Sequence, residues 1–173
     1  MSNMKTGMRK FSGLLLIVSV ILLGYLSSCN NYNQEKLRKQ ELELLDNYII
    51  KNKITVSPTN SGLYYIEVKK GTGDTIQVGD RVQIWYKTYL LSDSTLIDDS
   101  GRYNPLEFYC TTAGSSSVIE GLNEAVKFMQ KGTIANLIIP SELAYGQNGT
   151  TGISGFTSLL MNVEVYKVYK ASN

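Results

Sequence analysis

The sequence contains no histidine and only two cysteines, and these shortages exclude several kinds of active site. Without an imidazole there can be no Ser-His-Asp triad, no histidine base and no histidine-containing zinc site. Cys29 and Cys110 are too few for a four-thiolate metal site and too far apart for a Cys-x-x-Cys redox pair. We therefore expect an activity that needs neither a bound metal nor a cofactor.

The sequence also lacks an excess of either sign of charge, because 17 basic and 15 acidic residues give a net charge of only +2. Three of the cations, Lys5, Arg9 and Lys10, lie within residues 1–28, which hold no acidic residue, so the remaining chain carries a net charge of −1. A near-neutral protein has no electrostatic reason to bind nucleic acid. The length of 173 residues and the hydrophobic content of 43% suit one domain with appendages.

The first 28 residues have the organisation of a signal peptide. A basic segment is followed by the apolar Phe11–Leu26, which is shorter than the ~20 residues of a membrane-spanning helix. Small residues then precede Cys29, and Leu-Ser-Ser-Cys resembles a bacterial lipobox, which implies cleavage before Cys29 and its lipidation. The alternative is an uncleaved signal anchor. We expect a lipid-anchored protein of the bacterial cell envelope, on the periplasmic face of the outer membrane.

Residues 29–57 are predicted to contain a tether and an amphipathic helix. Within Gln34–Lys53, an apolar stripe consists of Leu42, Leu45, Tyr48 and Ile49, which predicts about five helical turns. The helix has two alternative roles: a spacer that packs lightly on the domain, or a surface for homodimerisation or partner docking.

Residues 58–173 are predicted to form one α+β domain. Its central helix is marked by Leu122, Ala125, Val126 and Met129, at offsets of 0, 3, 4 and 7, and ends at Lys131-Gly132. β-favouring segments lie on both sides of it, at residues 63–69, 81–91, 96–98, 105–110, 133–139 and 158–169. This order predicts an antiparallel sheet packed over one helix. The glycine-rich residues 146–157 are expected to form a mobile flap.

Two sequence blocks at this spacing resemble the FK506-binding-protein (FKBP) type of peptidyl-prolyl cis-trans isomerase. They are V-I-E-G-L-(x)6-M-(x)2-G, from Val118, and I-I-P-x-x-L-A-Y-G, which ends at Gly146. The layout is also similar to gliding-motility-associated lipoproteins of this type. The resemblance implies a five- or six-stranded antiparallel sheet wrapped around one short central helix. It also implies an enzyme for X–Pro bonds, with proline-containing unfolded or exported polypeptides as substrates.

Catalytic roles follow from the same resemblance for Tyr86, Asp98, Ile119 and Tyr145, with the Ile119 backbone N–H as a donor to substrate. The residues implied in substrate binding are Ile97, Leu106, Val118, Leu122, Ile153, Phe156 and Met161. Several of these are aliphatic where the family usually has aromatic residues, so the pocket is expected to be wider and to lack ring stacking on proline. Two alternatives therefore stay open: a non-catalytic peptide-binding chaperone, and a structural component of an envelope or motility complex.

Overall fold

The structure, a computed structural model, describes residues 32–101 and 103–172 of the chain. The predicted signal peptide and the lipidation site Cys29 lie outside the described residues. A helix occupies residues 32–51. The chain divides into two units, residues 1–40 and 41–173, so this helix continues from the first unit into the second. Within the described part of the chain, no helix has both the length and the apolar character needed to cross a membrane.

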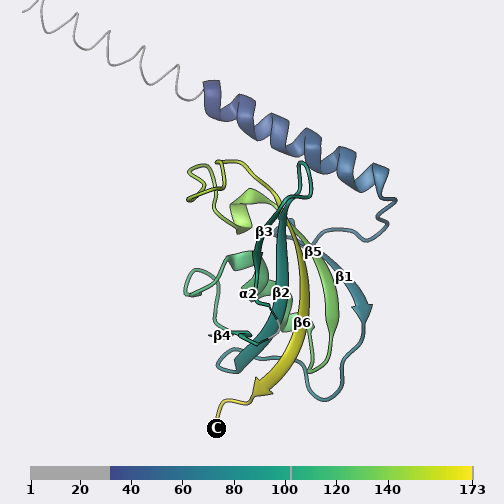
Figure 1. Cartoon of the computed structure of the whole chain (residues 1–173), viewed down its shortest axis with the longest axis vertical. Helices are drawn as coiled ribbons and strands as arrows, with labels where there is room; N and C mark the ends of the chain where they lie inside the picture. Colours follow the sequence, from purple (N-terminus) through teal and green to yellow (C-terminus); the bar gives the residue numbers. More distant parts are fainter. Residues whose placement is uncertain (1–31, 102, 173) are drawn as a thin grey trace, which may run out of the picture. The chain divides into compact units, whose positions relative to one another are not determined.

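The second unit contains one antiparallel sheet of six strands, so the predicted fold class is confirmed. The strands are β1 (Tyr64–Lys69), β2 (Arg81–Leu90), β3 (Leu96–Asp99), β4 (Leu106–Tyr109), β5 (Ile134–Ile139) and β6 (Leu159–Tyr169). Figure 1 shows the order β1-β5-β6-β2-β3 across the sheet. β6 pairs with β2 along its whole length, and the other edge of β2 is shared by β4 and β3.

One face of the sheet packs against the short helix α2 (Glu120–Ala125), and the main core lies between them. Because side chains alternate along a strand, every second residue of β5 and β6 points to this face. These residues are Ala135, Leu137 and Ile139 on β5, and Leu159, Met161, Val163 and Val165 on β6. From the helical side come Leu122, Ala125, Val126 and Met129, all buried as their spacing predicts.

The central helix is shorter than its sequence predicts. After α2 the chain continues as one 3-10 turn, η1 (Val126–Phe128), and Met129 is extended, with φ −101° and ψ 162°. The Met129 carbonyl accepts the N–H of Ile76 at 3.0 Å, so a neighbouring loop takes the bond that a longer helix would use. Gly132 has the expected positive φ of 81°, but it belongs to the turn before β5.

A smaller core covers part of the opposite sheet face. Leu45, which is 6% exposed, packs there with Leu91 and Ile138, and Tyr48 and Ile49 of the same helix lie against them. Leu42, by contrast, is 42% exposed, so its predicted place on the buried stripe is wrong. The residue one turn before Leu45 on the buried side is Glu41, which is 3% exposed. A helical stripe at 41, 45, 48 and 49 has the regular spacing, and only the charge of Glu41 hides it in the sequence.

The glycine-rich residues 146–157 fold into a compact loop. The N–H groups of Thr150 and Ile153 each donate to the other residue's carbonyl at 2.9 Å. A side chain at Gly155 would overlap the carbonyl of Gln147, and one at Gly149 would overlap the carbonyl of Ile153. The glycines are therefore required because backbone segments approach each other closely in this loop.

Candidate active site

An open cleft of about 490 Å³ lies between the start of α2 and the strands of the inner sheet face. Its size is within the range of small-ligand and peptide sites. The lining residues are Tyr86, Thr88, Asp98, Leu106, Ser116, Ser117, Val118, Ile119, Glu120, Leu122, Ala144, Tyr145, Leu159 and Met161. The cleft thus brings together residues from β2, β3, β4, β6, α2 and the segment after β5.

A tyrosine and a carboxylate are joined on the β2–β3 side of this cleft. The Tyr86 hydroxyl donates to Asp98 Oδ2 at 2.7 Å, and the Asp99 N–H donates to Asp98 Oδ1 at 2.9 Å. Antiparallel pairing of Thr88 with Asp98 holds the two strands in this register. Partial burial, followed by the hydrogen bond to Asp98, raises the pKa of the Tyr86 phenol, so Tyr86 remains a donor and Asp98 an oriented acceptor.

The backbone before α2 forms another part of the cleft. Val118 and Ile119 line it, and Ile119 is extended, with φ −58° and ψ 142°, immediately before the helix. Among the described residues, no acceptor is found for the Ile119 N–H. The position of α2 is fixed by buried Asn123, whose side-chain amide exchanges two hydrogen bonds, at 3.0 and 3.1 Å, with the backbone of Thr111. The Ile119 N–H is therefore a donor on a well-anchored backbone.

Tyr145 reaches the cleft from the segment that follows β5. A 3-10 turn, η2 (Ser141–Leu143), comes after Pro140, and the Ser141 carbonyl accepts the N–H groups of Ala144 and Gly146 at 2.9 and 2.7 Å. These two residues flank Tyr145, whose side chain is 39% exposed. The geometry holds the backbone on both sides of the tyrosine and leaves the ring accessible to a ligand.

Eight of the eleven residues implied by the resemblance line the cleft, and three do not. Ile97 is the extra residue of a β-bulge, because Asp98 pairs with Thr88 and Leu96 with Tyr89, and its side chain packs against the core. Ile153 takes part in the hydrogen-bonded pair within the glycine-rich loop, and Phe156 lies in a small hollow beside Glu41 and Leu44.

The cleft also contains six residues to which the sequence assigned no site role: Thr88, Ser116, Ser117, Glu120, Ala144 and Leu159. Leu159 is the second residue before Met161 on β6, so strand alternation could have identified it. Thr88 bears the same relation to Tyr86 on β2. Ala144 adjoins Tyr145, but nothing in its residue type distinguishes it from an ordinary core alanine.

Residues 32–101 and 103–172 contain no group of three His, Cys, Asp or Glu side chains arranged to hold a metal ion. Cys110 is a free, buried thiol, and burial raises its pKa. It therefore packs as a small apolar residue next to Phe108 in the main core.

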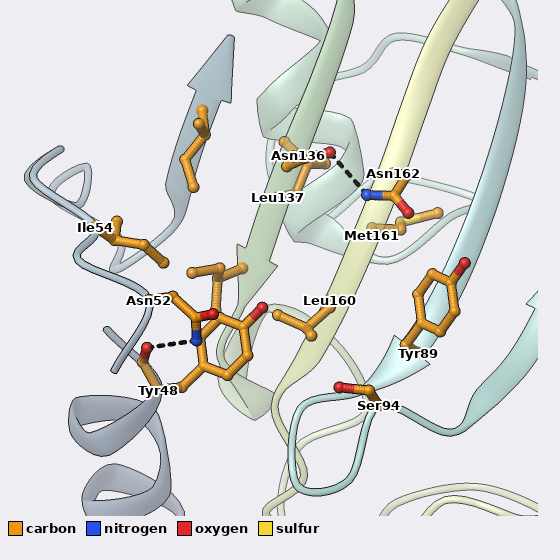
Figure 2. A pocket seen from close by; sticks show the side chains of 12 residues that line it. Tyr48, Asn52, Ile54, Tyr89, Ser94, Asn136, Leu137, Leu160, Met161 and Asn162 are labelled. Carbon is orange, nitrogen blue, oxygen red and sulfur yellow. Dashed lines mark hydrogen bonds between the residues drawn. The ribbon is translucent and has the colours of Figure 1, made fainter. Parts of the chain in front are cut away.

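A second hollow, of about 380 Å³, lies on the opposite sheet face. Figure 2 shows its side chains, including Tyr48, Tyr89 and Leu160, together with a hydrogen bond of 2.7 Å between Asn136 and Asn162. Of the residues implied by the resemblance, only Met161 borders it. The proposed catalytic residues are therefore gathered in the cleft beside α2.

Comparison with known proteins identifies the family of this domain. The family model described as FKBP-type peptidyl-prolyl cis-trans isomerase matches residues 73–166, which include the whole of β2 to β5. The chain is 34% identical over 110 residues to the FKBP-type peptidyl-prolyl cis-trans isomerase FkpA of Buchnera aphidicola, covering 64% of this chain and 42% of that protein. It is 34% identical over 116 residues to FkpA of Escherichia coli strain K12, covering 67% of this chain and 41% of that protein.

A solved structure is also similar. The crystal structure of a peptidyl-prolyl cis-trans isomerase from Pseudomonas syringae pv. tomato superimposes with a TM-score of 0.67 at 29% identity, covering 79% of this chain and 96% of that one. The chain spans less than half the length of the two FkpA proteins. The family model covers more than half of this chain, and its match includes Tyr86, Asp98, Ile119 and Tyr145. This chain belongs to the FKBP-type peptidyl-prolyl cis-trans isomerase family.

Proposed function

We propose that this protein is a peptidyl-prolyl cis-trans isomerase that acts on proline-containing unfolded or exported polypeptides in the bacterial cell envelope. The observation that carries the proposal is the cleft beside α2. There, the Tyr86–Asp98 pair, at 2.7 Å, faces the same apolar space as the Ile119 backbone and the Tyr145 side chain.

The reaction requires binding and desolvation but no nucleophile. Rotation about an X–Pro bond must overcome a barrier of ~20 kcal/mol that arises from amide resonance, and no covalent bond is broken. The twisted amide is less polar than the planar one, so a dry, apolar site favours the twisted state over the ground state. The aliphatic half of the cleft lining, which includes Leu122, Leu159 and Met161, would supply the apolar part of this environment.

The apolar side chains would take the proline ring. Leu122 and Met161 line the cleft and are almost completely buried, and the half-buried Leu106 and Val118 line it too. They exclude water from the amide without stacking on the ring, because none of the four is aromatic. This difference favours binding of proline through shape and dryness, and it predicts a lower rate than a fully aromatic pocket would give.

The polar groups would hold the two peptide units next to the proline. The Ile119 N–H and the Tyr145 hydroxyl are donors, so each would bind a substrate carbonyl. Asp98, fixed by Tyr86 and by the Asp99 N–H, is an acceptor whose carboxylate faces the space where the amide twists. A fixed carboxylate at this point would favour the twisted amide through electrostatic complementarity.

The proposed location in the cell envelope depends on the sequence before the described residues. A lipobox-like Leu26-Ser-Ser-Cys29 after a basic and apolar leader supports lipidation of Cys29. Several acyl chains on one residue would anchor the protein stably, because one chain alone gives only marginal binding. The substrates would then be exported chains that fold close to the membrane.

The activity is tested with a denatured protein whose refolding is limited by proline isomerisation. Full-length protein in detergent should accelerate the slow refolding phase, and Tyr145→Phe should reduce that acceleration about three- to tenfold, the value of one hydrogen bond. Leu96→Ala, at an exposed position outside the cleft, is the matched control and should retain the wild-type rate. An unchanged slow phase with folded wild-type protein would exclude the enzyme.

A second candidate function, docking into a larger envelope complex, is supported by the N-terminal helix. Its side chains Leu37, Leu44 and Ile50 are exposed although they are apolar. Leu37 and Leu44 are seven residues apart and so share one face of the helix. The double variant Leu37→Glu/Leu44→Glu should retain isomerase activity but lose association with other envelope proteins in crosslinking experiments. Unchanged crosslinks would rule out this helix face as the docking surface.

A further inference from the structure

The carboxylate of Glu41 lies almost completely inside the protein and is bound to two separate segments of the domain. The Glu41 side chain is 3% exposed. Its Oε1 accepts hydrogen bonds from the Ser141 N–H and the Ser158 hydroxyl, and its Oε2 accepts one from the Ser141 hydroxyl, each at 2.7 Å. Both serines are buried. These are well-formed hydrogen bonds by distance.

The two serines stand on either side of the glycine-rich loop and next to the cleft. Ser141 begins η2, and its carbonyl accepts the N–H groups of the two residues that flank Tyr145. Ser158 immediately precedes β6, and the following residue, Leu159, lines the cleft. One carboxylate therefore holds the backbone that carries Tyr145 and the start of a strand in the cleft wall.

A carboxylate at this buried position destabilises the fold unless its hydrogen bonds compensate for the lost hydration. Burying a carboxylate loses its hydration, whereas an apolar side chain would pack the helix onto the domain without that loss. Leu45, one turn later on the same buried stripe, does so. Glu41 differs from Leu45 in having fixed polar partners: its two oxygens accept hydrogen bonds from one N–H and two hydroxyls at once.

We propose that Glu41 is a positioning residue for the active cleft, which makes residues 41–51 of the N-terminal helix part of the isomerase unit. By fixing Ser141, Glu41 sets the position of Tyr145, and by fixing Ser158 it sets Leu159. The effect on catalysis rests on the proposed isomerase function, but the effect on the loop does not.

The loop is tested by hydrogen exchange, which needs no activity. In the full-length protein, Glu41→Ala should accelerate exchange of the Gly146 and Phe156 amides at least about tenfold, because both belong to the network that Ser141 anchors. Leu45→Ala is the matched control: it removes a buried side chain one turn away but no bond to either serine. Equal acceleration in both variants would overturn the proposal, because it would show a general loss of helix packing.

Catalysis is tested with the same two variants at a temperature where both are folded. Glu41→Ala should lower kcat/KM for an X–Pro peptide about tenfold, mainly through kcat, since misplacement of a catalytic group by less than 1 Å has effects of this size. Leu45→Ala should stay within about twofold of wild type. Glu41→Gln, which keeps one acceptor oxygen, should fall between wild type and Glu41→Ala.

The route through Tyr145 is tested by a double-mutant cycle. If Glu41 acts by positioning Tyr145, Glu41→Ala should have less effect on kcat/KM in a Tyr145→Phe background than in wild type. An undiminished effect would overturn this route. If the wild type shows no isomerase activity, the proposed function fails, and hydrogen exchange alone then decides whether Glu41 positions the loop.

Discussion

Gly121, the glycine of the V-I-E-G-L block, should be replaceable only at a measurable cost, because α2 touches β5 at this residue. A Cβ built on Gly121 would overlap Ile139 Cγ2 and would lie 3.3 and 3.4 Å from Cγ1 and Cβ of the same side chain. Ile139 is fully buried and cannot swing into solvent. In Gly121→Ala, either the helix or the isoleucine must therefore move.

The size of the effect follows from two opposing terms. Overpacking a core by one methyl group costs about 1–3 kcal/mol, whereas alanine in place of glycine in a helix gains at most about 1 kcal/mol. We therefore expect Gly121→Ala to lower the free energy of unfolding by about 1–2 kcal/mol. With a typical urea dependence, the midpoint of unfolding should fall by about 1 M.

A second substitution separates this contact from a general effect on the helix. Ile139→Ala alone should cost about 2–5 kcal/mol, because it leaves a cavity in the core. The added methyl group of Gly121→Ala partly fills that cavity, so the double variant should be more stable than the sum of the single effects predicts. Urea unfolding of the wild type, the two single variants and the double variant measures this coupling. Strict additivity, or a Gly121→Ala variant as stable as wild type, would refute the reasoning.

Further predictions concern a buried carboxylate, the phenol in the cleft and the lipid anchor. Burial opposes ionisation of Asp80, but bonds from the Gln77 and Ala171 N–H groups and from Lys170, at 2.8, 3.0 and 2.9 Å, lower its pKa. Its contribution to stability should thus be constant above about pH 5 and be lost as the pH falls below about 4, through the folded-state pKa. The stability difference between wild type and Asp80→Asn should narrow over that range, and a gap that is unchanged at low pH would contradict the assignment. Since burial and the bond to Asp98 raise the pKa of Tyr86, its NMR signals should not titrate near pH 10, where exposed tyrosines ionise. Mass spectrometry of the membrane-bound protein should find an acylated Cys29 as its first residue, and an intact leader of residues 1–28 would argue for an uncleaved anchor.

The fold was predictable because local signals and the core pattern agree. Strand boundaries follow the β-branched and aromatic runs, so β2 and β6 differ from their predicted ranges by only one residue at one end. The buried face of the central helix was also evident from its spacing. Its early end was not, because Met129 is helical by spacing but extended in the structure, where its carbonyl serves Ile76.

The cleft was predictable only in part. Tyr145 lies in one of the two sequence blocks that resemble the family, whereas Tyr86 and Asp98 lie outside both blocks and were implied only by the wider resemblance; all three line the cleft. Ile97 does not line the cleft because a β-bulge changes which side chain points inward, and a bulge leaves no clear sign in the sequence. Phe156 was grouped with the cleft because loops are hard to place, whereas its backbone has a positive φ of 55° and its ring lies beside Glu41.

Glu41 illustrates the remaining limit of sequence reasoning. Its position on the helical stripe is regular, but a charged residue is normally assigned to solvent. The partners that allow its burial, Ser141 and Ser158, are 100 and 117 residues away in sequence. No local pattern joins the three residues, so only the folded structure could reveal their connection.

The central claim is tested most directly by the rate of cis-to-trans isomerisation in a short X–Pro peptide, measured with and without the full-length protein. The proposal predicts acceleration by wild type, a clear loss in Asp98→Ala and a smaller loss in Tyr145→Phe, with both variants folded. Folded wild-type protein that binds the peptide but leaves this rate unchanged would contradict the enzyme assignment and favour a peptide-binding chaperone.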